Sequence, residues 1–169
     1  MGATVGSPFI SQALVKERSR NLTRQAANRR SSPETVSSHL SSVRLFSTSG
    51  KKELRSIAKS AKIVSVTQGT QLITEGDDGD TMYVILDGTA RVSRNGRKLA
   101  IAGPGDSFGE LALLSKGPRT ASVVALSDLE VAIISRRQLL NLVETAPAFA
   151  RRLLESLADL VRELDKKIV

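Results

Sequence analysis

Nine of the twelve glycines in the 169-residue chain lie between Gly69 and Gly117, with short runs of β-forming residues between and beside them. The Asn95-Gly96 pair separates two of these runs and suits a two-residue hairpin, because both central positions of a type I′ turn require positive φ. The runs in order are KIVSV, QLITE, MYVIL, TARVSR, KLAIA, ASVVAL and LEVAII. Many short strands with closely spaced turn signals predict an antiparallel jelly-roll β-barrel over residues 62–134.

Apolar residues recur at helical spacing on both sides of the predicted barrel. The segment 36–60 is expected to form N-terminal helices, with Ser49 as the N-cap of the second helix. The segment 136–165 is expected to form C-terminal helices that are interrupted at Pro147. The predicted fold class is therefore mainly β with flanking helices, in one domain that spans residues 35–169.

The first part of the chain, residues 1–34, is rich in serine and arginine and has no sustained apolar period, which predicts a disordered basic tail. It carries six Lys and Arg residues against Glu17 and Glu34, so it holds +4 of the net charge of +8. An organelle transit peptide and a start codon placed too early are the alternatives. Because basic residues are not interleaved with aromatic ones, nucleic-acid binding is not predicted.

The composition excludes several kinds of site. Cysteine is absent, so disulfides and thiolate metal sites are ruled out, and the single histidine, His39, leaves almost no material for a zinc site. We expect His39 to be a structural or surface residue, and we expect no metal and no cofactor. No apolar run approaches the roughly 18–20 residues that a membrane span requires. These features predict a cytoplasmic protein without a membrane span.

The segment FGELALLSKGPRTASV, residues 108–123, places a glutamate and an arginine at the two ends of an apolar run. It is typical of a strand that turns into one helical turn, whose first N–H groups lack partners and attract a phosphate. Gly109 lets a ligand approach the backbone, and Arg119 would add charge-assisted hydrogen bonds to the same anion. Glu110 would repel the phosphate unless it accepts from a neutral hydroxyl, such as a ribose 2′-OH. The segment therefore predicts a nucleotide site, and without a P-loop lysine a singly charged phosphate is favoured.

The same segment resembles the phosphate-binding cassette of the cyclic nucleotide-binding domain family. This family includes the bacterial catabolite activator proteins and the regulatory subunits of cyclic-AMP-dependent kinase. The matching features are Phe-Gly-Glu-Leu-Ala-Leu, a short spacer, Pro-Arg and then small residues, with no insertion. The resemblance extends upstream through GTQLITEGDDGDTMYVILDGTARVSRNGRKLAIAGPGDSFGE and into both helical regions. It covers about 130 residues, from Val36 to Glu163.

The resemblance implies a role for each residue of the cassette. Glu110 would accept from the ribose 2′-OH, and Arg119 would bind the exocyclic phosphate oxygen. The residues that would offer backbone groups to the ligand are Gly109, Leu111 and Ala112. The floor under the phosphate and the base would be formed by Thr120, Ala121 and Ser122.

The family's C-terminal helix usually closes over the base, and the candidate lid residues here are Leu160, Val161 and Leu164. Thr120 departs from family members that carry alanine after the arginine, and its hydroxyl would suit a guanine in the syn conformation. The choice between cyclic AMP and cyclic GMP therefore stays open, with cyclic AMP favoured.

The resemblance implies a non-enzymatic cyclic nucleotide sensor that moves its C-terminal lid helix and signals to a protein effector in trans. An enzyme is not expected, because phosphodiesterase chemistry needs clustered histidine and aspartate metal ligands. One alternative is a fragment of a catabolite-activator-type transcription regulator, although the sequence reaches Val169 without the helix-turn-helix of those regulators. The other alternative is a scaffold protein with an unoccupied pocket. The leucine face of the last helix is expected to pack against the barrel, and a homodimer stays open.

Overall fold

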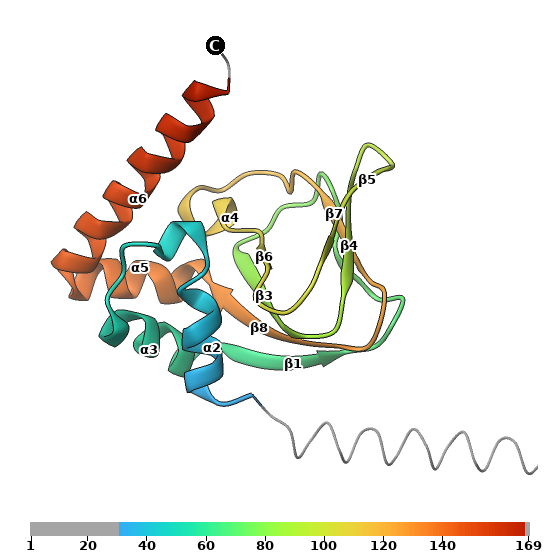
Figure 1. The fold of residues 1–169 in the computed structure, drawn as a ribbon, viewed down its shortest axis with the longest axis horizontal. Helices are drawn as coiled ribbons and strands as arrows, with labels where there is room; N and C mark the ends of the chain where they lie inside the picture. The colour runs from blue at the N-terminus through green and yellow to red at the C-terminus, as the bar shows by residue number, and fades with distance from the viewer. Residues whose placement is uncertain (1–30, 168–169) are drawn as a thin grey trace, which may run out of the picture. The chain divides into compact units, whose positions relative to one another are not determined.

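The computed structural model describes residues 31–167 (Figure 1). The predicted tail, residues 1–34, therefore lies outside the described residues apart from its last four, and the first helix already begins at Pro33. The helical elements are α2 (Pro33–Leu40), the 3₁₀ turn η1 (Arg44–Phe46), α3 (Lys51–Ser60), α4 (Leu111–Leu114), α5 (Arg136–Thr145) and α6 (Pro147–Lys166). The strands are β1 (Lys62–Val66), β2 (Gln71–Ile73), β3 (Thr81–Asp87), β4 (Ala90–Arg94), β5 (Arg97–Ala102), β6 (Ser107–Phe108), β7 (Ser122–Ala125) and β8 (Leu129–Ser135).

The eight strands form two four-stranded antiparallel sheets. The first sheet has the strand order β1-β8-β3-β6, and the second has the order β2-β7-β4-β5. Asn95 and Gly96 connect β4 to β5 with φ values of 51° and 73°, which confirms the predicted hairpin. Each of the seven predicted runs contains a strand, and the two-residue β6 lies where a strand was expected to end before the helical turn of the cassette.

The antiparallel sheets with helices before and after them are confirmed. The described part of the chain holds more residues in helices than in strands, because α6 alone spans 20 residues, so "mainly β" understates the helices. Closure into a jelly-roll barrel stays a prediction, because the pairing of the described strands joins no strand of one sheet to the other.

One capping prediction was wrong. Gly50, and not Ser49, is the N-cap of α3, and it makes no side-chain cap bond. The Ser49 N–H donates to the carbonyl of Phe46 at 3.0 Å, which keeps Ser49 in the turn that follows η1. The cap position therefore falls one residue later than the sequence pattern indicated.

Strand β3 is buried on both faces and divides the core into two parts. Met82 and Val84 point toward the helices, whereas Ile85 points toward the second sheet and packs there with Val123 and Val131. This alternation follows from the two-residue period of a strand. Burial on both faces explains why the sequence of β3 is apolar almost throughout.

The helices α2, α3, α5 and α6 and the turn η1 gather at one side of the first sheet (Figure 1). The rings of Phe46 in η1 and Phe149 in α6 stack with their centroids 6.4 Å apart, and both are fully buried. His39, in the last turn of α2, is half-buried. The N-terminal and C-terminal helices thus form one shared apolar cluster.

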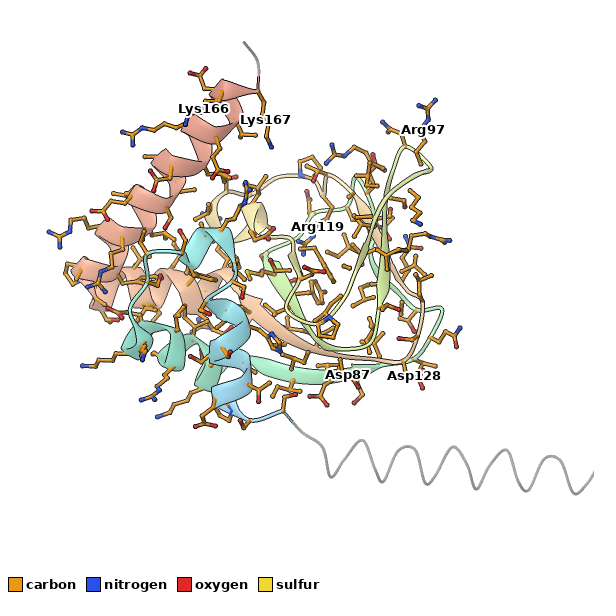
Figure 2. All side chains as sticks on the ribbon, in the orientation of Figure 1. Asp87, Arg97, Arg119, Asp128, Lys166 and Lys167 are labelled. Atoms are coloured by element: carbon orange, nitrogen blue, oxygen red, sulfur yellow. The ribbon has the colours of Figure 1, made fainter. Side chains whose placement is uncertain are left out.

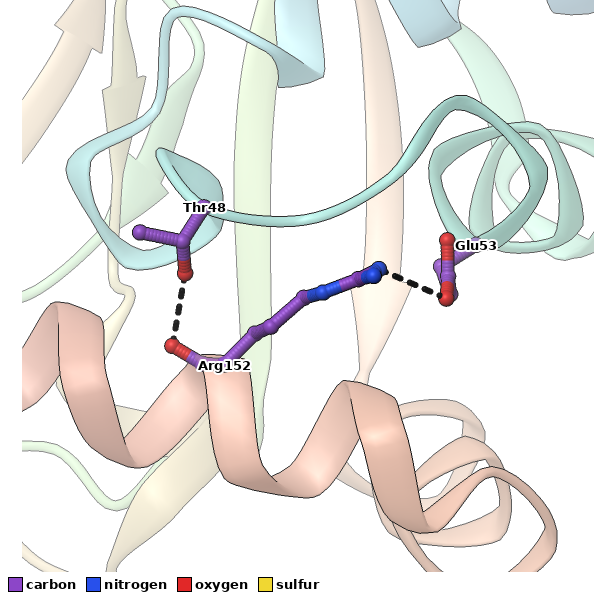
Figure 3. A network of polar contacts seen from close by, with 3 residues as sticks. All are labelled: Thr48, Glu53 and Arg152. Atoms are coloured by element: carbon purple, nitrogen blue, oxygen red, sulfur yellow. Dashed lines mark hydrogen bonds and ion pairs between the residues drawn. The ribbon is translucent and has the colours of Figure 1, made fainter.

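A polar network attaches the first half of α6 to Thr48, which follows η1, and to Glu53 in α3 (Figure 3). The Thr48 hydroxyl donates to the carbonyl of Arg152 at 2.7 Å, and Arg152 Nη1 donates to Glu53 Oε1 at 3.1 Å. Because Thr48 has a single hydroxyl proton, the buried hydroxyl of Ser156 must donate to Thr48, 2.9 Å away. Ser47 can then donate to Ser156 at 3.2 Å. Every hydroxyl in this network has a partner.

Candidate functional site

Gly109 lies between β6 and α4, where the backbone turns sharply into the predicted cassette. Its φ of +87° is one that residues with a side chain rarely adopt. A Cβ at this position would lie 2.6 Å from Arg119 Nη1 and 2.8 Å from the carbonyl oxygen of Thr81. Glycine is therefore required here both for the turn and for the close approach of the arginine.

Arg119 follows α4 at the far end of the cassette and is half-buried beside the strands (Figure 2). Its Nη1 donates to the carbonyl oxygen of Thr81 at 2.7 Å, and its Nη2 donates to the Thr81 hydroxyl at 3.0 Å. A guanidinium has five N–H groups, and these two bonds use two of them. Among residues 31–167, the other three have no hydrogen-bond partner, so they are available to an anion.

The loop from Glu75 to Asp80 also holds Arg119 in place. The backbone N–H of Arg119 donates to the carbonyl of Asp77 at 2.8 Å, and the N–H of Gly76 donates to the carbonyl of Arg119 at 2.9 Å. A Cβ at Gly79 would overlap the guanidinium of Arg119. The arginine therefore lies in a slot between two glycines.

Glu110 is half-buried at the N-cap position of α4 and makes no capping bond with its side chain. Instead, the Ser107 hydroxyl donates to Glu110 Oε1 at 2.6 Å. This contact fixes the carboxylate and leaves its second oxygen as an acceptor. An arginine with open donors and a glutamate with an open acceptor thus lie in one cassette.

Both residues line one cavity of about 230 Å³, a little below the volume range usual for small-molecule sites. The polar lining residues are Arg94, Ser107, Glu110, Arg119 and Thr120. The remaining lining residues are Ile73, Val92, Leu99, Phe108, Gly109, Ala121 and Val123. Of the eight cassette residues predicted from the sequence, the structure brings Gly109, Glu110, Arg119, Thr120 and Ala121 together at this cavity.

The other three predicted cassette residues do not line the cavity. Leu111 is 60% exposed, and Ala112 is buried with its N–H donating to the carbonyl of Gly109 at 3.1 Å. The Ser122 hydroxyl accepts from the N–H of Glu75 at 2.9 Å. These contacts shape the turns beside the cavity.

The three predicted lid residues lie away from the cavity, and none of them lines it. Val161 is 63% exposed and Leu164 is 51% exposed, whereas Leu160 is half-buried. Figure 2 shows Lys166 and Lys167 at the free end of α6, well apart from Arg119. In this arrangement α6 does not cover the cassette.

The structure adds residues around the cavity that the sequence did not indicate. Thr81 and Gly79 position Arg119, and Ser107 positions Glu110. Arg94 lines the cavity and donates through Nε to the carbonyl of Thr120 at 2.7 Å. Thr81 and Arg94 lie 38 and 26 positions from their partners, so no local pattern pointed to them.

Neither a metal site nor a membrane span is found in the described residues. Within 31–167, no group of three or more His, Asp or Glu side chains is placed to hold a metal ion. In the same range, no helix combines the length and apolarity needed to cross a bilayer.

Comparison with known proteins gives consistent matches. The Thermus thermophilus "Cyclic AMP receptor protein" is 37% identical over 106 residues, which are 60% of this chain and 49% of that protein. The Yarrowia lipolytica "cAMP-dependent protein kinase regulatory subunit" is 40% identical over 81 residues, 48% of this chain and 22% of that protein. The chain thus spans about half the length of the first relative and less of the second.

A solved structure agrees with these relatives. The cyclic nucleotide-binding-like protein from Brucella abortus superposes with a TM-score of 0.60 at 30% identity, covering 64% of this chain and 97% of that one. The profile of the cyclic nucleotide-binding domain matches residues 63–146, which include both sheets' central strands and the whole cassette. The chain belongs to the cyclic nucleotide-binding domain family.

Proposed function

We propose that this protein is a non-enzymatic sensor that binds cyclic AMP in the cavity beside Arg119. The observation that carries the proposal is the convergence of Arg119 and Glu110 on one cavity, each fixed by a second residue and each with open hydrogen-bonding capacity. The printed names of the Thermus and Yarrowia relatives, a receptor and a regulatory subunit for cyclic AMP, support the choice of ligand.

The binding mode follows from the placement of polar and apolar groups. Arg119 binds the phosphate through the N–H groups that Thr81 leaves open, and Glu110 accepts from the ribose 2′-OH. The base lies over the apolar part of the lining. Thr120 and Arg94 face its polar edge, so these two residues decide between adenine and guanine.

The lining also supports binding without catalysis. It contains one carboxylate and no histidine, cysteine or lysine. Glu110 is committed to Ser107 on one oxygen, and the ribose would take the other. No second acid or base remains to transfer a proton to a leaving oxygen.

The moving part of the proposed sensor is the second half of α6. The buried residues Phe149, Leu153 and Ser156 hold the first half in place, and Leu157 packs against the same helical cluster. Beyond Leu157 the helix is held mainly by an exposed ion pair. That pair joins Arg44 Nη1 to Glu163 Oε2 at 2.7 Å. Exposed ion pairs contribute about 0–1 kcal/mol, so residues 158–166 can leave this position at low cost and cover the base.

The signal passes to a protein effector in trans, and the protein acts in the cytoplasm. A second candidate is the sensor part of a larger transcription regulator. It is favoured by the match to 54% of the Mycobacterium tuberculosis "CRP-like cAMP-activated global transcriptional regulator", which is 29% identical over 120 residues. The two candidates share the nucleotide site and differ only in the output.

Calorimetric titration of the purified chain with cyclic AMP, cyclic GMP and 5′-AMP tests the proposal. Saturable binding of a cyclic nucleotide at one site per chain, with 5′-AMP binding more weakly, is expected. If neither cyclic nucleotide binds, the sensor is ruled out, and the alternative function of a scaffold with an unoccupied pocket remains.

A further inference from the structure

Helix α3 carries a row of cations on its solvent face. Lys52, Arg55 and Lys59 are all exposed, and their spacing of three and four residues places them in one line. Lys51 precedes the row and Lys62, at the start of β1, extends it, and both are also exposed. We call these five residues the basic face of α3. The helix is about 15 Å long, so the charges lie close enough to act together.

No ion pair within the described residues neutralises the basic face. The three ion pairs found there involve Arg44, Arg152 and Arg162. The single acidic residue of α3, Glu53, points to the other side, where Arg152 binds it and its side chain is only 17% exposed. The four cations of α3 and Lys62 of β1 therefore face solvent and make no ion pair with the one carboxylate of the helix.

The positive potential of this face reaches the neighbouring helix. The pKa of Glu34, in the first turn of α2, is lowered chiefly by a backbone hydrogen bond and by the Ser32 hydroxyl, with a further contribution from the charges of Arg55 and Lys59. A carboxylate that approaches from outside would meet the same potential.

We propose that the basic face of α3 is a docking surface for an acidic segment of a partner protein. A helix with glutamates or aspartates spaced three and four residues apart matches the row in length and in charge. The proposal does not depend on nucleotide binding, so it can fail while the proposed function holds.

The surroundings of the face favour a protein over a membrane or a nucleic acid. The exposed large apolar side chains of residues 31–167 lie on other elements, so the face has no group to insert into lipid. The aromatic rings of the same residues pack into the two core clusters, so none is placed to stack on a base.

The place of α3 in the fold suits an output surface. Its Glu53 is bonded to Arg152 of α6, and the carbonyl of Ser60 at its end accepts from the side chain of Gln138 in α5. The helix therefore contacts both C-terminal helices. A partner bound to α3 would lie beside the elements that follow the nucleotide site.

The test uses the full chain and a labelled helical peptide with glutamates at the matching spacing, compared with the same peptide carrying glutamines. The triple variant Lys52→Gln, Arg55→Gln, Lys59→Gln should bind the acidic peptide about tenfold more weakly than the parent. Glutamine preserves helix propensity, so the variant is expected to stay folded.

A matched variant removes three exposed cations elsewhere, Arg91→Gln, Lys98→Gln and Lys166→Gln. It should keep the affinity of the parent within a factor of about two. Equal loss of peptide affinity in both triple variants would overturn the proposal, because the net charge of the protein would then account for the binding. Equal binding of the glutamine peptide would also overturn it, because the binding would then be non-specific. Tighter binding to duplex DNA or to phosphatidylserine vesicles than to the peptide, lost in the α3 variant, would also overturn it.

Discussion

Arg119 donates from Nη1 and Nη2 to the carbonyl and the hydroxyl of Thr81, at 2.7 and 3.0 Å. The cation of the cassette is thus held by the first residue of β3, and the N–H of Arg136 at the start of α5 donates to the preceding carbonyl of Asp80 at 2.7 Å. A guanidinium that is already ordered loses little conformational entropy when it binds an anion. Thr81 and the residue before it, Asp80, thus link the arginine of the cassette to the first residue of α5.

Replacing Arg119 by alanine should weaken cyclic nucleotide binding by ~2–4 kcal/mol, because the variant loses the charged hydrogen bonds to the phosphate. Arg119→Lys should also bind weakly, because an ammonium lacks the planar fork that Thr81 orients. Calorimetric titration measures both effects. Arg91→Ala, which removes an exposed arginine outside the cavity, is the matched control and should bind as the parent does. Affinity within a few fold of the parent in Arg119→Ala would remove the anion-anchor role.

Thr81→Val keeps the shape of the side chain but removes the hydroxyl that accepts from Arg119 Nη2. The carbonyl bond remains, so we expect a moderate loss of about 1 kcal/mol in binding, roughly fivefold. Thr81→Ser retains the hydroxyl and should restore most of the affinity. If the valine and serine variants bind equally, the hydroxyl does not position the arginine.

Glu110 should discriminate ligands by their ribose. Glu110→Ala should lose more affinity than Glu110→Gln, because glutamine keeps an acceptor and drops only the charge. The parent should bind 2′-deoxy cyclic AMP poorly. Ser107→Ala should lower the affinity as well, since the carboxylate is then no longer fixed by the 2.6 Å hydrogen bond. Equal affinity for the deoxy and natural ligands would refute the ribose contact.

The sequence predicted those parts of the site that are local in the chain. Gly109, Glu110 and Arg119 lie within one short segment of the chain, and their residue types alone indicate a turn, an acceptor and an anion anchor. Thr81 and Arg94 could not be found in this way, because only strand pairing brings them to the cassette. The strands themselves were predicted well, because glycine turns and branched residues are local signals.

Closure of the lid helix over the base stays a prediction, because α6 does not line the cavity in the described arrangement. An apolar face on a helix indicates burial, but it does not say which surface covers it. Leu153 of that face packs into the helical cluster, whereas Leu164 is half exposed to solvent. The apolar periodicity is continuous along α6, so the sequence alone does not show where along the helix burial ends.

The hydroxyl network between Thr48 and α6 should stabilise the fold. Thr48→Val removes the donor to the Arg152 carbonyl and the acceptor of the buried Ser156 hydroxyl. Leaving these groups with fewer partners should lower the free energy of unfolding by ~1–3 kcal/mol. Thermal unfolding measures the change, and Thr145→Val on α5, whose hydroxyl is exposed, serves as the control. An unfolding midpoint unchanged from the parent would mean that water replaces the network without cost.

The second half of α6 should act on ligand binding without being needed for the fold. Truncation after Leu157 keeps the buried residues Phe149, Leu153 and Ser156, so the shortened chain should unfold at nearly the same temperature as the parent. It should bind cyclic nucleotides ~1–2 kcal/mol more weakly and discriminate less between bases, because the base then buries less apolar area at about 25 cal/mol per Å². A ligand can shift α6 only if it binds the closed arrangement better, so hydrogen exchange of residues 158–166 should slow when ligand is added.

Single substitutions on the two C-terminal helices separate this role from general packing. Leu164 in α6 and Leu140 in α5 are both leucines on helix surfaces, 51% and 40% exposed. If residues 158–166 close over the base, Leu164→Ala should weaken nucleotide binding several-fold, since transfer of one exposed leucine into a contact contributes about 1–2 kcal/mol. Leu140→Ala should leave the binding unchanged. Equal affinities for both variants, together with full affinity in the truncated chain and unchanged exchange, would place the conformational response outside α6.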